Sequence, residues 1–219
     1  GTVLLNATTA RFFARIIGVF LKKSNGILIV GASNPARLIA SYLRDKGKRI
    51  VIIDSNKQFI EQALEDNLEA LNVNIYDDEL TDNIELNDVG YLIALTANDT
   101  VNKQALENFS GVFGEHGSFK IASSTEINEA TVEEKLHFFT PKDDYINLSE
   151  AFRENPIIHQ VKIKDEKQYK EVLSVLYAEE KSIPLFVEKG TGLYLITEYE
   201  RDKLPKKELI ISYLGKKIV

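Results

Sequence analysis

Short, almost wholly apolar runs, each followed by a loop and a helix-length segment, constrain the fold of this chain most. The clearest runs are Ile27–Val30, Ile50–Ile53 and Tyr91–Leu95. A strand that is buried on both faces shows such a run, whereas a strand with one wet face alternates apolar and polar residues. Strands of this kind that alternate with helices form a parallel sheet with helices on its faces. The sequence therefore predicts an α/β fold with a doubly wound sheet.

Helix-end signals and a later change of pattern indicate how the rest of the chain is organised. Asn34 suits an N-cap, Pro35 the first helical position and Gly47 a left-handed C-cap, which predicts a helix from Pro35 to about Lys46. Further strands are expected at residues 68–71 and 119–122, a short acidic helix at 78–84 and a helix at 101–113. The mixed stretch 128–144 suggests a boundary or crossover. Beyond it we expect a small α+β unit with a strand at 157–163, a helix at 166–177, a hairpin at 183–187 and 193–197, and a last strand at 209–214.

The first residues differ from the rest in charge and pattern. Residues 1–23 carry four basic and no acidic side chains, so they contribute +4 to a net charge of -6. Apolar residues at helical spacing predict an amphipathic helix over residues 7–21, with its apolar face formed by Phe12, Phe13, Ile16, Ile17 and Phe20. Such a basic segment fits the cytoplasmic end of a membrane helix. The alternative is a helix that packs on the domain or on a second subunit.

Composition excludes several classes of function. The chain has no cysteine, which excludes disulfides, thiolate metal sites and cysteine nucleophiles. Its net charge of -6 disfavours broad nucleic-acid binding, which needs an excess of Lys and Arg. No apolar run reaches the about 20 residues of a spanning helix. Because there is also no methionine, we expect the chain to be a fragment of a longer protein.

The loop Gly31-Ala32-Ser33-Asn34-Pro35-Ala36, between the first strand and its helix, is the most informative motif. Dinucleotide folds place three glycines in this loop, for the tight turn, the phosphate approach and helix–strand packing. Here Gly31 keeps the first position, while Ser33 and Ala36 replace the others. The N-terminus of the following helix favours an anion. Alternatively, Asn34 and Pro35 serve only as a helix cap.

Asp54 strengthens this interpretation because it ends the second predicted strand. An acid there accepts hydrogen bonds from ribose hydroxyls and disfavours a 2'-phosphate, so we expect an NAD-like or adenosine ligand over NADP. The alternative is that Asp54 is only a turn residue.

The runs Gly26–Ala40 and Tyr91–Asp99 resemble the RCK or KTN (TrkA-N-like) domains, which are Rossmann regulatory domains of potassium channels and transporters. Residues 1–11 resemble the end of the final membrane helix of bacterial sodium/proton antiporters. The resemblance implies a juxtamembrane helix and linker at 1–24, a Rossmann nucleotide-binding domain at 25–140 and a small C-terminal domain at 141–219. It also implies a homodimer, a membrane transport domain in the same polypeptide, and a place at the cytoplasmic face of the bacterial inner membrane.

The resemblance further implies a ligand, NAD(H) or an adenine nucleotide (AMP, ADP or ATP), and its contacts. The phosphate contacts fall on Gly31, Ser33, Asn34 and Ala36, and the ribose contact on Asp54. Asn74, Thr96 and Asn98 would flank the base or ribose. All of these residues follow predicted strands, at the edge where doubly wound sheets bind ligands.

Two alternatives remain, an NAD-dependent oxidoreductase and a Rossmann scaffold that only mediates dimerisation. The three histidines are scattered, and the Tyr-x-x-x-Lys pairs Tyr42/Lys46 and Tyr177/Lys181 are ordinary helix neighbours. The acids at 77–79 suit a helix start as well as a metal. We therefore expect no catalytic residue and no metal site. Apolar residues around 136–139 without an evident partner favour a dimer.

Overall fold

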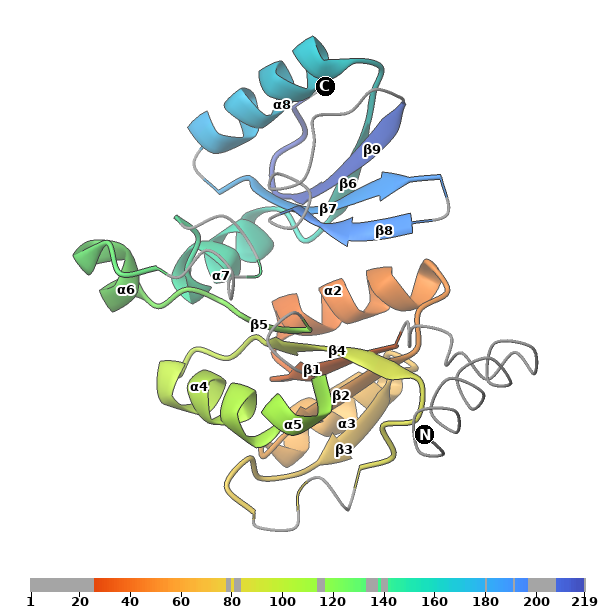
Figure 1. Cartoon of the computed structure of the whole chain (residues 1–219), viewed down its shortest axis with the longest axis vertical. Helices are drawn as coiled ribbons and strands as arrows, with labels where there is room; N and C mark the ends of the chain where they lie inside the picture. The colour runs from red at the N-terminus through yellow and green to blue at the C-terminus, as the bar shows by residue number, and fades with distance from the viewer. Residues whose placement is uncertain are drawn as a thin grey trace, which may run out of the picture.

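A computed structural model of the chain contains two β-sheets with helices packed on them (Figure 1). It describes residues 26–77, 80, 84–113, 117–132, 138, 142–179, 181–190, 192–196 and 208–218. The amphipathic helix predicted before residue 24, most of the acidic helix predicted at 78–84, and the histidines at 116 and 137 lie outside these residues. No helix in the described ranges has both the length and the apolar character needed to cross a membrane.

The first sheet is parallel throughout and has the strand order β3-β2-β1-β4-β5. Its strands are β1 (Gly26–Val30), β2 (Ile50–Asp54), β3 (Glu69–Asn72), β4 (Val89–Ala94) and β5 (Ser118–Lys120). From β1 the chain first builds outward to β3 and then crosses to β4 on the other side. The predicted doubly wound sheet is confirmed, and its strand order reverses between β1 and β4.

Helices cover both faces of this sheet because β1 is apolar on both sides. Ile27 and Ile29 belong to one core with α2 (Asn34–Asp45) and α3 (Lys57–Glu65). Leu28 and Val30 belong to the other, with Ala105 of α4 (Asp99–Asn108). The predicted single helix at 101–113 is wrong, because α4 ends at Asn108, Phe109 is its C-cap, and the short α5 (Ser110–Phe113) follows. Phe109 is fully buried at the point where the two helices meet.

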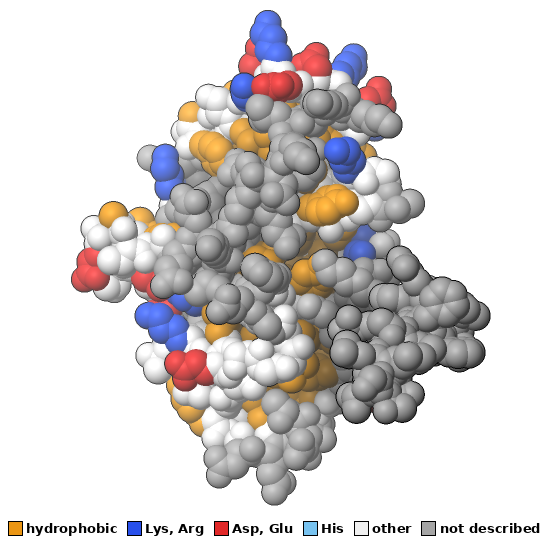
Figure 2. Space-filling view, viewed as in Figure 1, with side chains coloured by type: hydrophobic (Ala, Val, Ile, Leu, Met, Phe, Trp, Pro, Cys, Tyr) orange, Lys and Arg blue, Asp and Glu red, His pale blue; other side chains and the backbone are white. Residues whose placement is uncertain are grey.

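The second sheet is antiparallel and has the order β6-β9-β7-β8. Its strands are β6 (Ile158–Ile163), β7 (Ile183–Lys189), β8 (Gly192–Leu195) and β9 (Leu209–Leu214). The predicted hairpin and last strand are confirmed. Helix α8 (Glu166–Ala178) buries Val172, Leu173 and Leu176 against one face of the sheet. Its outer face carries charged side chains (Figure 2), including the i,i+4 pairs Lys170–Glu166 and Lys167–Glu171.

Two helices in the connection were missed by sequence analysis. Helix α6 (Ser124–Glu129) begins with a capping box in which Ser123 and Glu126 cap each other's backbone. Helix α7 (Tyr145–Glu154) buries Leu148 and Ala151 in the core shared with β1 and β7. Phe138 is fully buried, and its ring centroid lies 5.8 Å from that of Phe186. The expectation of unpartnered apolar residues at 136–139 is therefore wrong for Phe138, while its neighbours there lie outside the described residues.

Helix α2 joins the two sheets through Tyr42. The Tyr42 hydroxyl donates to Glu188 Oε1 at 2.8 Å, accepts from Gln160 Nε2 at 2.9 Å and lies 2.5 Å from Ser212 Oγ. Its ring stacks on Phe186 with a centroid separation of 5.8 Å. Burial raises the pKa of Tyr42, and the adjacent Glu188 carboxylate raises it further. The three polar partners come from β7, β6 and β9, so this one side chain spans the second sheet.

Replacing Tyr42 with Phe keeps the stacked ring and removes the hydroxyl. Because Ser212 is fully buried and loses a partner, we expect the free energy of unfolding to fall by about 1–3 kcal/mol in chemical denaturation. Tyr76→Phe is the matched control, since Tyr76 is 53% exposed and its loss should fall within about 0.5 kcal/mol. Equal effects of the two variants would contradict this role of the hydroxyl.

Candidate functional site

Gly31 occupies a position that only glycine tolerates. Its φ is +108°, in the region that side chains rarely adopt. A Cβ there would lie 2.7 Å from the carbonyl oxygen of Leu95 and 2.9 Å from Cγ2 of Thr96. The loop after β1 therefore passes directly against the end of β4. This contact brings Gly31 and Thr96 together, as the sequence predicted for one ligand edge.

The carboxylate of Asp54 is bonded to two loops. Its Oδ2 accepts from the N–H of Ala32 at 2.7 Å, and its Oδ1 accepts from the N–H of Asn56 at 2.8 Å. Asn72, at the end of β3, donates to the Asp54 carbonyl oxygen at 3.0 Å. Asp54 therefore acts as a turn residue, but each carboxylate oxygen has a second acceptor position for a ribose hydroxyl. The structural and ligand-binding interpretations are compatible.

The N-terminus of α2 follows directly on this loop. The predicted N-cap at Asn34 is wrong, because the helix begins at Asn34 and Ser33 is its N-cap residue. The Ser33 hydroxyl makes no capping bond and has no partner in the described part of the chain. The N–H of Arg37 bonds back to the Ser33 carbonyl at 2.9 Å. The N–H groups of Asn34 and Ala36 precede it at the open end of the helix, whereas Pro35 has none.

Ala36 fills the position of the third glycine and is fully buried in the core with β1. A methyl side chain therefore fits where helix and strand pack closely. The altered loop therefore keeps the close helix–strand packing that the third glycine provides in dinucleotide folds.

Asn102, which sequence analysis missed, shapes the loop after β4. Its side chain is 1% exposed and accepts from both the N–H and the hydroxyl of Thr96, at 3.0 and 2.8 Å. It also donates to the Thr96 carbonyl at 3.0 Å. Asn98 is the N-cap of α4 and accepts from Thr100 and Val101. The structure thus holds Thr96 at the edge, while the Asn98 amide oxygen serves the helix.

Asn74 lies farther out, after the edge strand β3. Its Oδ1 accepts from the N–H of Tyr76 at 3.2 Å, which forms a local turn. The strand order separates β3 from β1 by β2. The structure therefore brings Gly31, Asp54 and Thr96 to neighbouring strand ends, with Asn74 at the margin.

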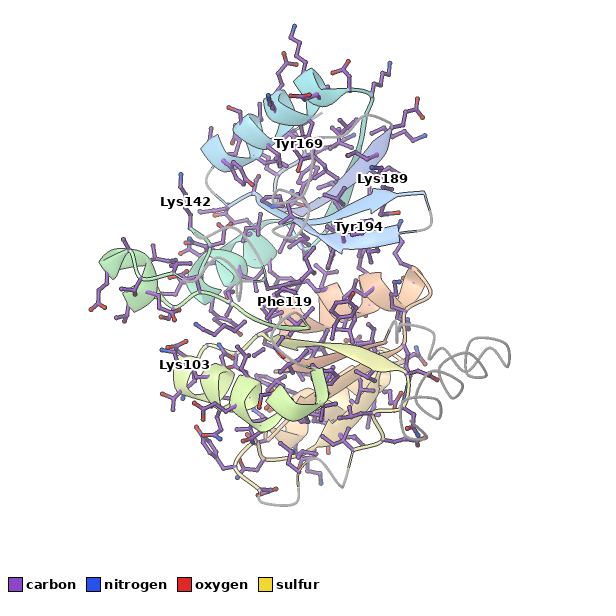
Figure 3. All side chains as sticks on the ribbon, viewed as in Figure 1. Lys103, Phe119, Lys142, Tyr169, Lys189 and Tyr194 are labelled. Atoms are coloured by element: carbon purple, nitrogen blue, oxygen red, sulfur yellow. The ribbon has the colours of Figure 1, made fainter. Side chains whose placement is uncertain are left out.

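A charged cluster that sequence analysis also missed stands beside this edge. The Lys120 side chain, only 4% exposed, lies 2.9 Å from Asp99 and 2.6 Å from Glu126. Lys103 projects from α4 and contacts the same two acids (Figure 3). A cleft of about 120 Å³ adjoins the cluster and is lined in part by Thr96, Asp99, Asn102, Ser123 and Asp144. Paired charges join α4, β5 and α6 here.

The sequence matches the model of one known protein family. Residues 27–137, about half of the sequence, match the model of the TrkA-N domain. The chain belongs to the TrkA-N domain family. The matched range of this TrkA-N domain includes every residue of the loop after β1, as well as Asp54 and Thr96. No curated protein matches the sequence.

Several solved structures are similar in part. The NAD(P)-binding domain of an exopolyphosphatase-related protein from Archaeoglobus fulgidus is 16% identical, with a TM-score of 0.40, over 52% of this chain and 84% of that one. The GsuK RCK domain is 10% identical, with a TM-score of 0.41, over 89% of this chain and 46% of that one. N5-carboxyaminoimidazole synthetase from Staphylococcus aureus is 14% identical, with a TM-score of 0.34, over 87% and 47%. The chain thus spans less than half the length of the last two.

The charged cluster makes a prediction about pH. Burial tends to raise the pKa of Glu126, but hydrogen bonds from Lys120 and the Ser123 backbone outweigh it and lower this pKa to about 2. A carboxylate whose pKa is lower in the folded state stabilises the fold above its unfolded pKa, and the contribution is lost as pH falls. The free energy of unfolding should therefore decrease between about pH 5 and pH 2.

Denaturation of wild type and Glu126→Gln across this range checks the prediction. The variant should be less stable at pH 7, and its stability should change less between pH 5 and pH 2. Glu65→Gln, at an exposed position at the end of α3, should keep the wild-type profile. A Glu126→Gln profile parallel to wild type would contradict the assignment.

Proposed function

We propose that this TrkA-N domain binds NAD(H) or an adenine nucleotide and thereby regulates a monovalent cation (Na⁺/H⁺) antiporter. The observation that carries the proposal is the junction of Gly31, Ala32 and Asp54 at the point where the strand order reverses. In open α/β sheets, this point is where ligands bind at the carboxyl ends of the strands.

The chemistry of the junction supports a nucleotide. The helix N-terminus after Ser33 offers N–H groups and the positive end of the helix dipole to phosphates. Asp54, at the end of β2, offers carboxylate oxygens to ribose hydroxyls. A 2'-phosphate placed against this carboxylate would be repelled, which favours NAD or adenosine ligands over NADP.

Regulation requires that the nucleotide bind two arrangements of the protein with different affinities. In our proposal these are arrangements of a homodimer at the cytoplasmic face of the bacterial inner membrane. The segment at residues 7–21 passes the difference to a membrane transport domain of the same polypeptide. The family match and the resemblance of residues 1–11 to the end of an antiporter membrane helix support this assignment. The domain itself catalyses nothing in this scheme.

An NAD-dependent oxidoreductase is less well supported. The Tyr42 hydroxyl is bound to the second sheet, and burial raises its pKa, whereas a tyrosine acid–base catalyst needs a lowered one. Lys46 pairs with Glu188. His159 lies in β6, where its ring centroid is 5.5 Å from that of Tyr213. These groups therefore contact residues of the second sheet and do not lie at the strand ends of the first sheet.

Calorimetric titration with NADH, NAD, ATP, ADP and AMP tests nucleotide binding. We expect at least one of these nucleotides to bind with a dissociation constant below about 1 mM. Asp54→Ala should weaken the affinity for that nucleotide about tenfold or more, because a charged hydrogen bond is lost. Asp45→Ala is the control, since this acid is exposed in α2 and pairs with Arg44. Absence of binding to wild type would refute the proposal, as would equal effects of the two variants.

Transport by the full-length polypeptide tests the regulatory part. In everted membrane vesicles, the nucleotide identified by calorimetry should change the rate of Na⁺-driven proton movement. Asp54→Ala should remove this response and leave basal transport in place. If transport by wild type and variant responded equally, the regulatory role would be wrong. Reduction of a carbonyl substrate by bound NADH would instead support the oxidoreductase.

A further inference from the structure

Arg37 connects the loop after β1 to the segment after α3. Its Nη1 donates to the carbonyl oxygen of Ala32 at 2.9 Å, and its Nη2 donates to Oδ1 of Asn34 at 3.0 Å. Its Nε donates to Asp66, just after α3, at 2.8 Å. Only 12% of the side chain is exposed. One guanidinium thus serves three acceptors from separate positions.

The position of this cation is unusual for a helix. Arg37 lies in the first turn of α2, where no acidic residue is present. The helix dipole disfavours a positive charge at this end and favours a negative one. The hydrogen bonds to Ala32, Asn34 and Asp66 compensate for that placement, which indicates that the arginine is there for the loop rather than for the helix.

The two bonds at Ala32 fix the orientation of the loop backbone. Asp54 accepts from the N–H of Ala32, and Arg37 donates to its carbonyl oxygen. In a trans peptide the carbonyl of one residue and the N–H of the next point in opposite directions. Holding the Ala32 carbonyl therefore directs the Ser33 N–H away from the guanidinium. A loop with glycine at this position would leave that peptide freer to turn.

We propose that Arg37 is the positioning residue of the phosphate loop. By holding the Ala32–Ser33 peptide, it directs the Ser33 N–H to the same anion as the N–H groups of Asn34 and Ala36. It thereby gives a loop with one glycine a fixed phosphate-binding shape. This inference rests on the proposed nucleotide function, and it assigns Arg37 to the ligand's phosphates rather than to its adenosine part.

Arg44 provides a matched control on the same helix. Its Nη1 donates to the carbonyl oxygens of Asp66 and Asn67, so both arginines bond to the segment after α3. Among the hydrogen bonds of the described residues, those of Arg37 reach the loop and those of Arg44 do not. Thermal unfolding of the variants at both positions verifies that the fold is retained.

Calorimetry with ADP and adenosine distinguishes a role of Arg37 in phosphate binding from a role in adenosine binding. Arg37→Ala should weaken ADP binding about tenfold or more and adenosine binding less than about twofold, because only ADP carries phosphates. Arg37→Lys should behave like Arg37→Ala, since an ammonium lacks the planar fork. Arg44→Ala should change neither affinity by more than about twofold. Full rescue by Lys, or equal losses for both ligands, would overturn the inference.

Amide hydrogen exchange in the ligand-free protein gives a readout that does not depend on binding. Arg37→Ala should speed exchange at the Ala32 N–H, which donates to Asp54, about tenfold or more relative to Arg44→Ala, because the loop opens locally. If wild type bound no nucleotide but this exchange changed, the nucleotide function would fail and the positioning role would stand. Unchanged exchange would overturn the positioning role itself.

Discussion

Packing of α2 against both sheets is the constraint on which the rest of the structure depends. Its residues Ile39, Ala40 and Leu43 are fully buried in a core that also contains residues of β1 and β7. Tyr42 extends the same helix into the second sheet through its hydroxyl and stacked ring. Because buried packing of this kind resists small shifts, a movement of α2 relative to one sheet would also disturb its contacts with the other. The helix therefore links the loop after β1, at the strand ends of the first sheet, to the second sheet.

The loop at the beginning of α2 is held on both sides of one residue. Asp54 binds the N–H of Ala32 and Arg37 binds its carbonyl, while Gly31 supplies the positive φ that lets the loop pass β4. A loop fixed before the ligand arrives loses less conformational entropy on binding. In our proposal, this arrangement is how a motif with a single glycine holds a shape that can bind a phosphate.

The order of strands and helices was predictable because strands buried on both faces leave continuous apolar runs, as at Ile27–Val30 and Ile50–Ile53. The positions of the loop after β1 and of Asp54 were predictable because each follows directly from the end of such a run. Contacts between distant residues were not: nothing near Arg37 in the sequence indicates Asp66, and nothing near Lys120 indicates Asp99. Helix α7, which directly follows the mixed stretch 128–144, was missed although Asp144 is its N-cap and Leu148 and Ala151 are buried at helical spacing. The capping box at Ser123 and Glu126 was a readable signal for α6.

The central claim is that a nucleotide binds at the edge formed by the loop after β1, the end of β2 and the end of β4. Backbone amide NMR during titration with ADP or NADH tests it most directly. Our account predicts the largest chemical-shift changes at Ser33, Asn34 and Ala36, with smaller ones at Asn56 and Thr96. Changes confined to the second sheet, or no change at saturating ligand, would contradict it.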